Sequence, residues 1–378
     1  MVYKLLVTSL VQLPIVTRDD DDDSGDHDGP SNCVTAIPGP NGNVPVDSCN
    51  SYYNYDPQFA PAVAVAVIFG VLTGVHIIEA IIYRKKYMWV LIMGAMWETI
   101  AFILHSLGTR DQQKVGYATG WQVLFLLAPL WINASVYMTF ARMTWFFLPD
   151  QRIGGIKPMS IAKYFVWADV FTFLVQAAGG VLTSPDTSSD IVKIGIDIYM
   201  AGMGLQQFFI LLFLALMVTF HHRASTTPPE AFSETGENKQ GWKTLLMTLY
   251  VVLALITARN GYRIAEFAGG ITPSNPVPFH EVYSYALDCF PMMLTLSVLA
   301  IWHPGRTLVG PASEFPRKSR AEKKREKQEQ KAAKKQAKDQ KRWPKSSQDA
   351  SHSGHIEEAI QLNRYHDSGY DRLSDQVV

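Results

Sequence analysis

Charged residues lie inside the last two apolar stretches of this chain, where a membrane-spanning helix normally carries none. The two polar sets are Arg259, Arg263 and Glu266 in the first stretch, and Glu281, Tyr285 and Asp288 in the second. Both sets have the spacing i, i+4, i+7, which places each set on one face of a helix. If the two helices are antiparallel neighbours, Arg259 lies level with Asp288, and Arg263 and Glu266 lie near Glu281. A charge at the centre of a bilayer costs about 2.5 to 3.5 kcal/mol, so these faces are expected to contact protein or water and to mark a pathway or a site.

The elements that position these residues are seven apolar windows, each long enough to cross a bilayer as a helix. The windows cover residues 60–83, 88–107, 118–141, 161–182, 194–221, 242–268 and 282–302. Backbone groups in lipid must form hydrogen bonds within their own segment, which favours helices over strands. The predicted fold class is therefore an all-α integral membrane protein, a bundle of seven transmembrane helices.

Basic residues are concentrated in the first, third and fifth connections, whereas the even-numbered connections contain only Arg110, Lys114 and Lys193. This bias places the N-terminus outside and the C-terminus in the cytoplasm. The sequence thus predicts three regions: an extracellular, largely disordered tail over residues 1–58, a seven-helix domain over 59–305, and a cytoplasmic basic tail, disordered or partly helical, over 306–378.

The two tails suggest different partners. Cys33 and Cys49 lie in the outer tail, where oxidation is permitted, and either a disulfide or two free thiols fits their positions. The basic run over residues 314–345 either binds anionic lipids of the inner leaflet through its charge or is simply a solvated tail. A nucleic-acid partner is not expected, because the run is tethered at a membrane.

Further polar residues inside other windows include Glu98 in the second, Asp169 in the fourth and Gln206 in the fifth. For the two carboxyl groups, a functional role and a structural role are both open. For Gln206 we favour a hydrogen bond between helices, which contributes about 0.6 kcal/mol in a membrane.

The spacing of chemically active residues does not point to an enzyme. The glycines Gly236 and Gly241 have phosphate-loop spacing, but Trp242 stands where that loop needs lysine. The histidines lack the HExxH spacing of a zinc site. We therefore predict no catalytic residue, no metal site and no cofactor, with an intramembrane enzyme assembled from several helices as the remaining alternative.

Several segments together resemble one known family. The run from Phe279 to Met292 followed by His303-Pro304-Gly305 resembles the last-helix signature of the fungal RTA-like family, the lipid-translocating exporters. That family includes aminocholesterol-resistance proteins and sphingoid long-chain-base exporters. The segment from Arg259 to Glu266 resembles its Arg, Arg, Glu motif in the sixth helix, and Gly202 with Gln206 resembles its fifth helix.

One segment departs from the family pattern. The second helix of the family usually reads Glu, then Gly-Tyr, then Arg, whereas here Glu98 is followed by Ala101-Phe102 and His105. The basic residue of that helix is thus a titratable histidine. The resemblance implies seven spans with an outside N-terminus, handling of amphiphilic lipids at the plasma membrane, and resistance to drugs and other toxic amphiphiles.

The polar faces and the resemblance together predict a lipid translocator or efflux protein. In this reading the polar faces line a cavity that opens to the outer half of the bundle, where Glu281 or Asp288 binds the amine of a sphingoid base and Tyr285 supplies a hydroxyl. Two alternatives are a seven-helix receptor or regulator of membrane lipid homeostasis, and an intramembrane lipid-modifying enzyme. A plainer alternative is that the polar faces only hold the helices together.

Overall fold

The computed structural model describes residues 34–46, 48, 50–182, 189–227, 241–269, 275–310, 313–315, 325, 328–329 and 331–336. The chain divides into two compact units, Met1–Phe315 and Pro316–Val378. The described residues of the second unit are helical, and Arg325 pairs there with Glu329 at 3.3 Å. Cys33 and Cys49, for which the sequence leaves a disulfide open, lie outside the described residues.

The first unit consists of long helices. They are α2 (Phe59–Tyr83), α3 (Trp89–Gly108), α4 (Val115–Phe147), α5 (Pro158–Leu182), α6 (Ser189–Thr226), α7 (Gly241–Ala268) and a last helix in three parts, α8 (Glu281–Ser284), η5 (Tyr285–Cys289) and α9 (Phe290–Ile301). Short 3₁₀ turns are η1 (Pro40–Gly42), η2 (Lys86–Met88), η4 (Val277–Phe279) and η6 (Pro304–Arg306). Seven of the described segments are long and apolar enough to cross a membrane, which confirms the predicted seven-helix fold class.

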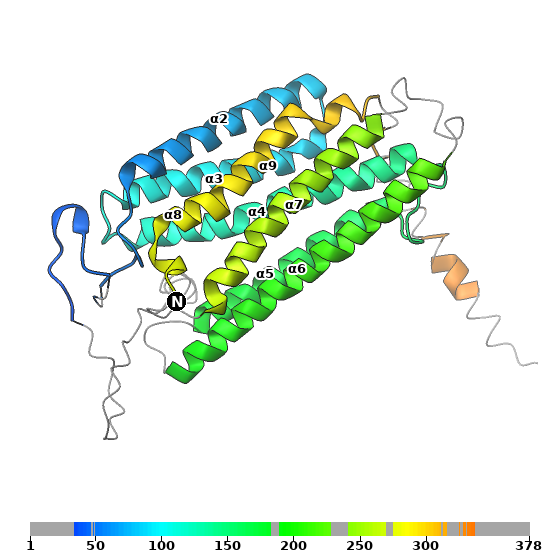
Figure 1. The fold of residues 1–378 in the computed structure, drawn as a ribbon. Helices are drawn as coiled ribbons and strands as arrows, with labels where there is room; N and C mark the ends of the chain where they lie inside the picture. Colours follow the sequence, from blue (N-terminus) through cyan, green and yellow to red (C-terminus); the bar gives the residue numbers. More distant parts are fainter. Residues whose placement is uncertain are drawn as a thin grey trace, which may run out of the picture. The chain divides into compact units, whose positions relative to one another are not determined.

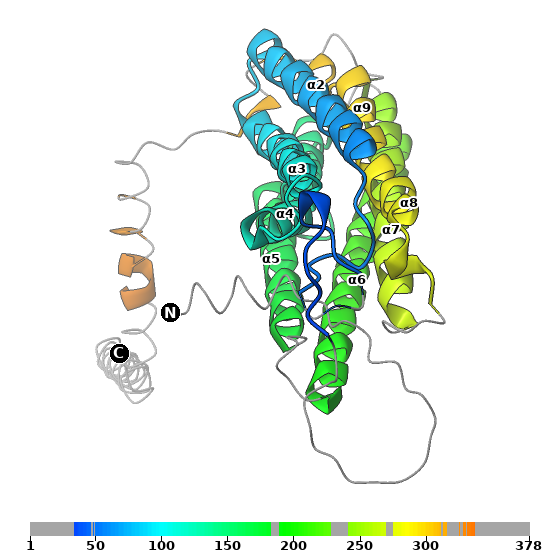
Figure 2. The same ribbon diagram turned by 90° about the vertical axis from the view of Figure 1, so that its left-hand side faces the viewer.

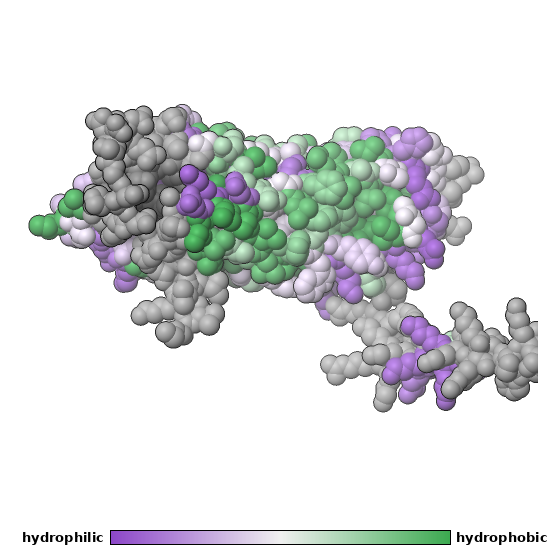
Figure 3. All heavy atoms as spheres, turned by 90° about the horizontal axis from the view of Figure 1, so that it is seen from below, coloured by the Kyte–Doolittle hydropathy of each residue, from purple (hydrophilic) through white to green (hydrophobic). Residues whose placement is uncertain are grey.

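The seven helices form one bundle with alternating directions (Figure 1). Neighbours along the chain pack side by side in the pairs α2 with α3, α3 with α4, and α5 with α6, while α7 contacts both α6 and α9 (Figure 2). On the face that Figure 3 shows, hydrophobic side chains cover the middle of the bundle and hydrophilic ones gather toward its ends. Large apolar side chains such as Ile81 and Trp167 are 70% and 68% exposed, as a surface facing lipid requires.

The two ends of the bundle are named here by residues of the last helix. The Glu281 end is where α2, α4, α6 and α8 begin, and the His303 end is where α3, α5 and α7 begin. The alternation follows from the short connections, because each helix must return across the bundle.

The last span is not a continuous α-helix. Between α8 and α9, residues Tyr285–Cys289 form a π-helix, in which the Phe290 N–H donates to the Tyr285 carbonyl five residues earlier. Pro291 follows directly, and because proline has no N–H and its ring clashes with the carbonyl four residues back, it disfavours regular α-helical bonding there. A π-turn holds more residues than an α-turn, so it rotates Asp288 relative to Glu281.

Two glycines allow α5 and α6 to approach closely. A β-carbon on Gly179 would lie 2.5 Å from the backbone nitrogen of Tyr199 and 2.6 Å from the carbonyl oxygen of Gly195. A β-carbon on Gly202 would lie 2.7 Å from Cγ and 3.0 Å from the backbone nitrogen of Gln176. Since backbone atoms cannot move aside independently, only glycine fits this contact.

We therefore expect Gly179→Ala and Gly202→Ala each to destabilise the protein by about 1 to 3 kcal/mol through overpacking. The matched control is Gly74→Ala on α2, where an added β-carbon meets nothing within 4 Å. Thermal unfolding of the purified protein in detergent measures the effect. Equal melting temperatures for Gly179→Ala and Gly74→Ala would show that α5 and α6 are not in close contact.

Candidate functional site

Two arginines of α7 share one carboxylate of the last helix. Arg259 Nε lies 2.5 Å from Asp288 Oδ1, and Arg263 Nε lies 2.5 Å from Oδ2 of the same carboxylate. The Asp288 side chain is fully buried, and those of the arginines are 5% and 15% exposed. The prediction that Arg259 lies level with Asp288 is confirmed. We call these three residues the arginine–aspartate centre.

Glu266 extends this centre along α7. Its carboxylate lies 2.9 Å from Arg263 Nη1 and accepts a hydrogen bond of 3.4 Å from the Tyr262 hydroxyl. Arg263 forms its ion pairs with Glu266 and Asp288, whereas Glu281, near which the sequence places Arg263 and Glu266, pairs with His105. The π-turn explains the difference, since it turns Asp288 toward α7 and leaves the face of Glu281 directed at α3.

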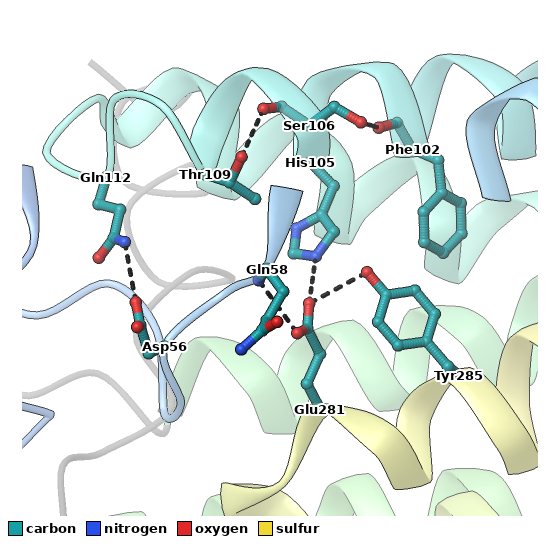
Figure 4. Close-up of polar contacts among 9 residues, drawn as sticks. All are labelled: Asp56, Gln58, Phe102, His105, Ser106, Thr109, Gln112, Glu281 and Tyr285. Atoms are coloured by element: carbon teal, nitrogen blue, oxygen red, sulfur yellow. Dashed lines mark hydrogen bonds and ion pairs between the residues drawn. The ribbon is translucent and has the colours of Figure 1, made fainter. Parts of the chain in front are cut away.

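Glu281 binds three donors at its own end of the bundle (Figure 4). His105 Nε2 lies 3.2 Å from Glu281 Oε1, and the Tyr285 hydroxyl donates to the same oxygen at 3.0 Å. The backbone N–H of Gln58 donates to the other oxygen, Oε2, at 3.1 Å. We call Glu281, His105, Tyr285 and Gln58 the Glu281 cluster. Its carboxylate joins α3, α8 and the chain just before α2.

Aromatic rings surround this cluster. The ring of His105 is 4.4 Å from that of Trp121 and 6.2 Å from that of Tyr53, measured between centroids. Phe102 lies 6.1 Å from Tyr285 by the same measure. A carboxylate framed by aromatic faces is a favourable place for a cation, because both attract positive charge.

The chain before α2 packs over the cluster. Asp56 accepts a hydrogen bond of 3.2 Å from the Gln112 side chain, in the connection between α3 and α4 (Figure 4). The Tyr53 side chain is buried, and burial raises the pKa of its phenol, so the hydroxyl remains neutral. Arg110 lies over the ring of Phe59 at 3.9 Å. The polar, turn-rich composition of this segment does not indicate such packing.

A narrow cavity lies beside the arginine–aspartate centre, between α4, α5, α6 and α7. Its polar lining residues are Gln176, Tyr199, Gln206, Arg259, Asn260 and Arg263. Within the lining, Gln176 Nε2 of α5 donates to Gln206 Oε1 of α6 at 2.9 Å, so the predicted hydrogen bond between helices at Gln206 is present. The cavity volume of about 20 Å³ accommodates roughly one water molecule.

The two other predicted carboxyl groups differ in their surroundings. Glu98 is fully buried and lies within the electrostatic influence of Arg259 and Asp288. Asp169 instead accepts a hydrogen bond of 3.2 Å from the Asn133 side chain, with the Tyr137 hydroxyl beside it. Glu98 thus lies within electrostatic range of the arginine–aspartate centre, whereas Asp169 lies at the contact between α4 and α5.

Some residues of the site were not among the predicted ones. Phe125 of α4 lies under both guanidinium groups, with its centroid 5.7 Å from Arg259 and 5.4 Å from Arg263. Tyr199 and Asn260 line the cavity, and neither stands out among the polar residues of its span. Among the residues that the structure describes, no group of three or more His, Cys, Asp or Glu side chains is arranged to hold a metal ion.

Comparison with known proteins assigns this chain to a family. The family model described as RTA1 like protein matches residues 91–310. The chain belongs to the RTA1-like family. The matched range contains the whole arginine–aspartate centre and all of the Glu281 cluster except Gln58, so the resemblance in the sequence motifs is confirmed. With seven apolar helices, this family member is a multi-pass membrane protein.

Relatives of this family member carry names that refer to amphiphilic molecules. The "Probable lipid transporter atnI" of Emericella nidulans is 39% identical over 295 residues, which cover 77% of this chain and 77% of the relative. The "Sphingoid long-chain base transporter RSB1" of Saccharomyces cerevisiae is 22% identical over 300 residues, 71% of this chain and 78% of the relative. The "Protoporphyrin uptake protein 1" of the same yeast is 29% identical over 208 residues, which cover 55% of this chain and 65% of the relative. No solved structure matches this chain.

Proposed function

We propose that this protein translocates amphiphilic lipids, such as sphingoid long-chain bases or sterol-like amphiphiles, and so contributes to lipid asymmetry and to resistance against toxic amphiphiles. The observation that carries the proposal is the pair of polar groups on the last helix, the Glu281 cluster and the buried arginine–aspartate centre, inside a bundle whose surface carries many exposed apolar side chains. The family and the names of its relatives support the same class of cargo. The proposed mechanism is transport without a catalytic step.

We further propose that the Glu281 end faces the outside at the plasma membrane, because the connections at the His303 end carry most of the basic residues. The described helical residues of the second unit are exposed and mostly Lys, Ala, Gln and Glu. In this orientation the basic tail lies at the inner leaflet, where its lysines attract anionic headgroups at about 1 kcal/mol per charge near the surface.

In the proposed path, the lipid chain remains in the membrane while the headgroup moves from the Glu281 cluster toward the arginine–aspartate centre. A protonated amine replaces His105 and the Gln58 N–H as donor to Glu281, because an ammonium group supplies three donors and a full positive charge. Passage beyond that point requires α7 and the last helix to separate, since the ion pairs of Arg259 and Arg263 with Asp288 hold them together.

The test is movement of a labelled sphingoid base, with a phosphatidylcholine probe alongside, in cells and in liposomes that contain only the purified full chain. We expect the sphingoid base to move faster in these proteoliposomes than in protein-free liposomes. A change that occurs in cells but not in proteoliposomes would contradict translocation and support the receptor-like alternative, in which the same buried ion pairs hold two conformations.

A further inference from the structure

Glu98 is a buried carboxyl group that the proposed lipid path does not use. Its side chain is fully buried, and neither oxygen has a hydrogen-bond partner. The residue lies near the middle of α3, ten residues and therefore roughly 15 Å from the Glu281 end of that helix. A buried carboxylate without a donor or a cation is strongly disfavoured, so this conformation is suited to the protonated acid.

The charged groups that act on Glu98 electrostatically come from α7 and the last helix. They are Arg259, Arg263 and Asp288, and Cys289 of η5 lies within the same range. The helices α2 and α4 pack directly on α3, and their ionisable side chains nearer the His303 end are His76, Glu79 and Arg142. The cations that act on Glu98 are thus the same two guanidinium groups that pair with Asp288.

Glu98 and Asp288 therefore compete for the same arginines. Asp288 takes the Nε atom of each guanidinium group, whereas Nη2 of Arg259 is buried and has no hydrogen-bond partner. A guanidinium group carries five N–H donors, so Arg259 can also bind a second carboxylate. When Glu98 loses its proton, its carboxylate attracts Arg259 and weakens the ion pair between Arg259 and Asp288. When Glu98 regains the proton, Asp288 again pairs with both arginines.

We propose that Glu98 is the proton-binding site of a proton-coupled transport cycle, in which its protonation closes the contact between Arg259 and Asp288 and its deprotonation opens it. The inference rests on the proposed lipid translocation and adds its energy source. One proton bound on one side of the membrane and released on the other is the only chemical change, and no other reactant is needed.

Titratable groups at both ends of the bundle provide access for this proton. On α3, His105 lies seven residues from Glu98 on the same face and contacts Glu281. At the other end, His76 Nδ1 lies 3.3 Å from Glu79 Oε2, and Nε2 of the buried His303 has no hydrogen-bond partner. Each end thus has a buried histidine beside a carboxyl group, which is suited to accept or donate a proton.

The test uses the full chain in liposomes, with a labelled sphingoid base, a pH-sensitive dye inside, and the membrane potential clamped. For the wild type we expect a pH gradient to drive the lipid by about tenfold per pH unit beyond the distribution in protein-free liposomes, where the amine of the lipid itself titrates, if one proton moves with each lipid. A lipid gradient is expected to move protons in turn. Glu98→Gln is expected to move lipid only down its own gradient, with no proton movement. Asp169→Asn is the matched control, because it removes another buried carboxyl and is expected to keep the response to the pH gradient.

The outcomes separate the two proposals. If the wild type moves lipid but ignores the pH gradient, or if Glu98→Gln keeps the full response, proton coupling through Glu98 is wrong while lipid translocation stands. If the wild type moves no lipid under any gradient, the translocation proposal fails, and the coupling fails with it.

A second measurement does not depend on a variant that folds. Dicyclohexylcarbodiimide reacts with protonated carboxyl groups in apolar surroundings, and mass spectrometry of the treated wild type locates the adduct. We expect labelling of Glu98 that decreases as the pH rises. Absence of label on Glu98 at low pH, with Asp169 labelled in the same sample, would overturn the inference.

Discussion

Replacing Asp288 by asparagine is expected to destabilise the protein by about 3 to 5 kcal/mol, which is enough to abolish its folded yield. The reason is that one neutral side chain then faces two buried guanidinium groups, Arg259 and Arg263, which have lost the carboxylate they share. Arg259→Leu is expected to cost less, because Asp288 keeps its ion pair with Arg263. The measurement is the yield of monodisperse protein and its melting temperature after extraction in detergent.

Two combinations make this prediction sharper. Arg259→Leu combined with Asp288→Asn is expected to cost less than the sum of the single changes, since the residues interact directly. Exchanging the two charges, Arg259→Asp with Asp288→Arg, is expected to recover little, because the new arginine would face Arg263. Adding Arg263→Leu to the exchange is expected to improve recovery. Equal losses for Asp288→Asn and Arg259→Leu would contradict the shared carboxylate.

Glu281→Gln is expected to slow transport of an amine-bearing lipid by about 10- to 100-fold relative to a neutral lipid of the same chain length. The change removes a charge-assisted hydrogen bond of about 1.5 to 3 kcal/mol and leaves the shape of the side chain intact. Tyr285→Phe removes a neutral hydroxyl from the same cluster, so its effect is expected to be smaller. Paired transport rates for the two lipids in proteoliposomes give the ratio.

The control for this prediction is Asp150→Asn. Asp150 is an exposed carboxylate outside the spans, 2.8 Å from Arg223, and the hydrogen bond from that guanidinium lowers its pKa. It is therefore ionised at neutral pH, and the substitution removes one negative charge far from the Glu281 cluster. A similar change of the lipid ratio in both variants would remove Glu281 from amine recognition.

The charged face of α7 could be predicted from the sequence, because the period of an α-helix alone decides which side chains share a face. Arg259 and Arg263 recur at i and i+4, and lipid cannot solvate them, so contact with polar groups of a neighbouring span or with water was expected. The partner of Glu281 was not readable in the same way. An α-helical period from Glu281 through Tyr285 to Asp288 predicts that the three residues share one face. Instead, the π-turn before Pro291 directs Glu281 and Asp288 to different neighbours.

Contacts between distant segments account for what else the sequence did not show. Gln58 reaches Glu281 across 223 positions of the chain through a backbone N–H, which every residue except proline possesses. Phe125 contributes to the centre only because α4 passes beneath both arginines. His105 was visible as a basic residue near the end of its span, but its pairing with Glu281 depends on how α3 and α8 pack.

The position of Asp288 on the last helix also affects how the protein is made. Arg259 is synthesised 29 residues before Asp288, so at about 5 to 20 residues per second it precedes its carboxylate partner by roughly 1.5 to 6 seconds. Glu266 emerges directly after Arg263 and pairs with it locally, so one of the two charges is compensated while the ribosome is still translating. The last helix therefore completes assembly, and a chain that stops before it carries an unfinished charged interface that cellular quality control can recognise.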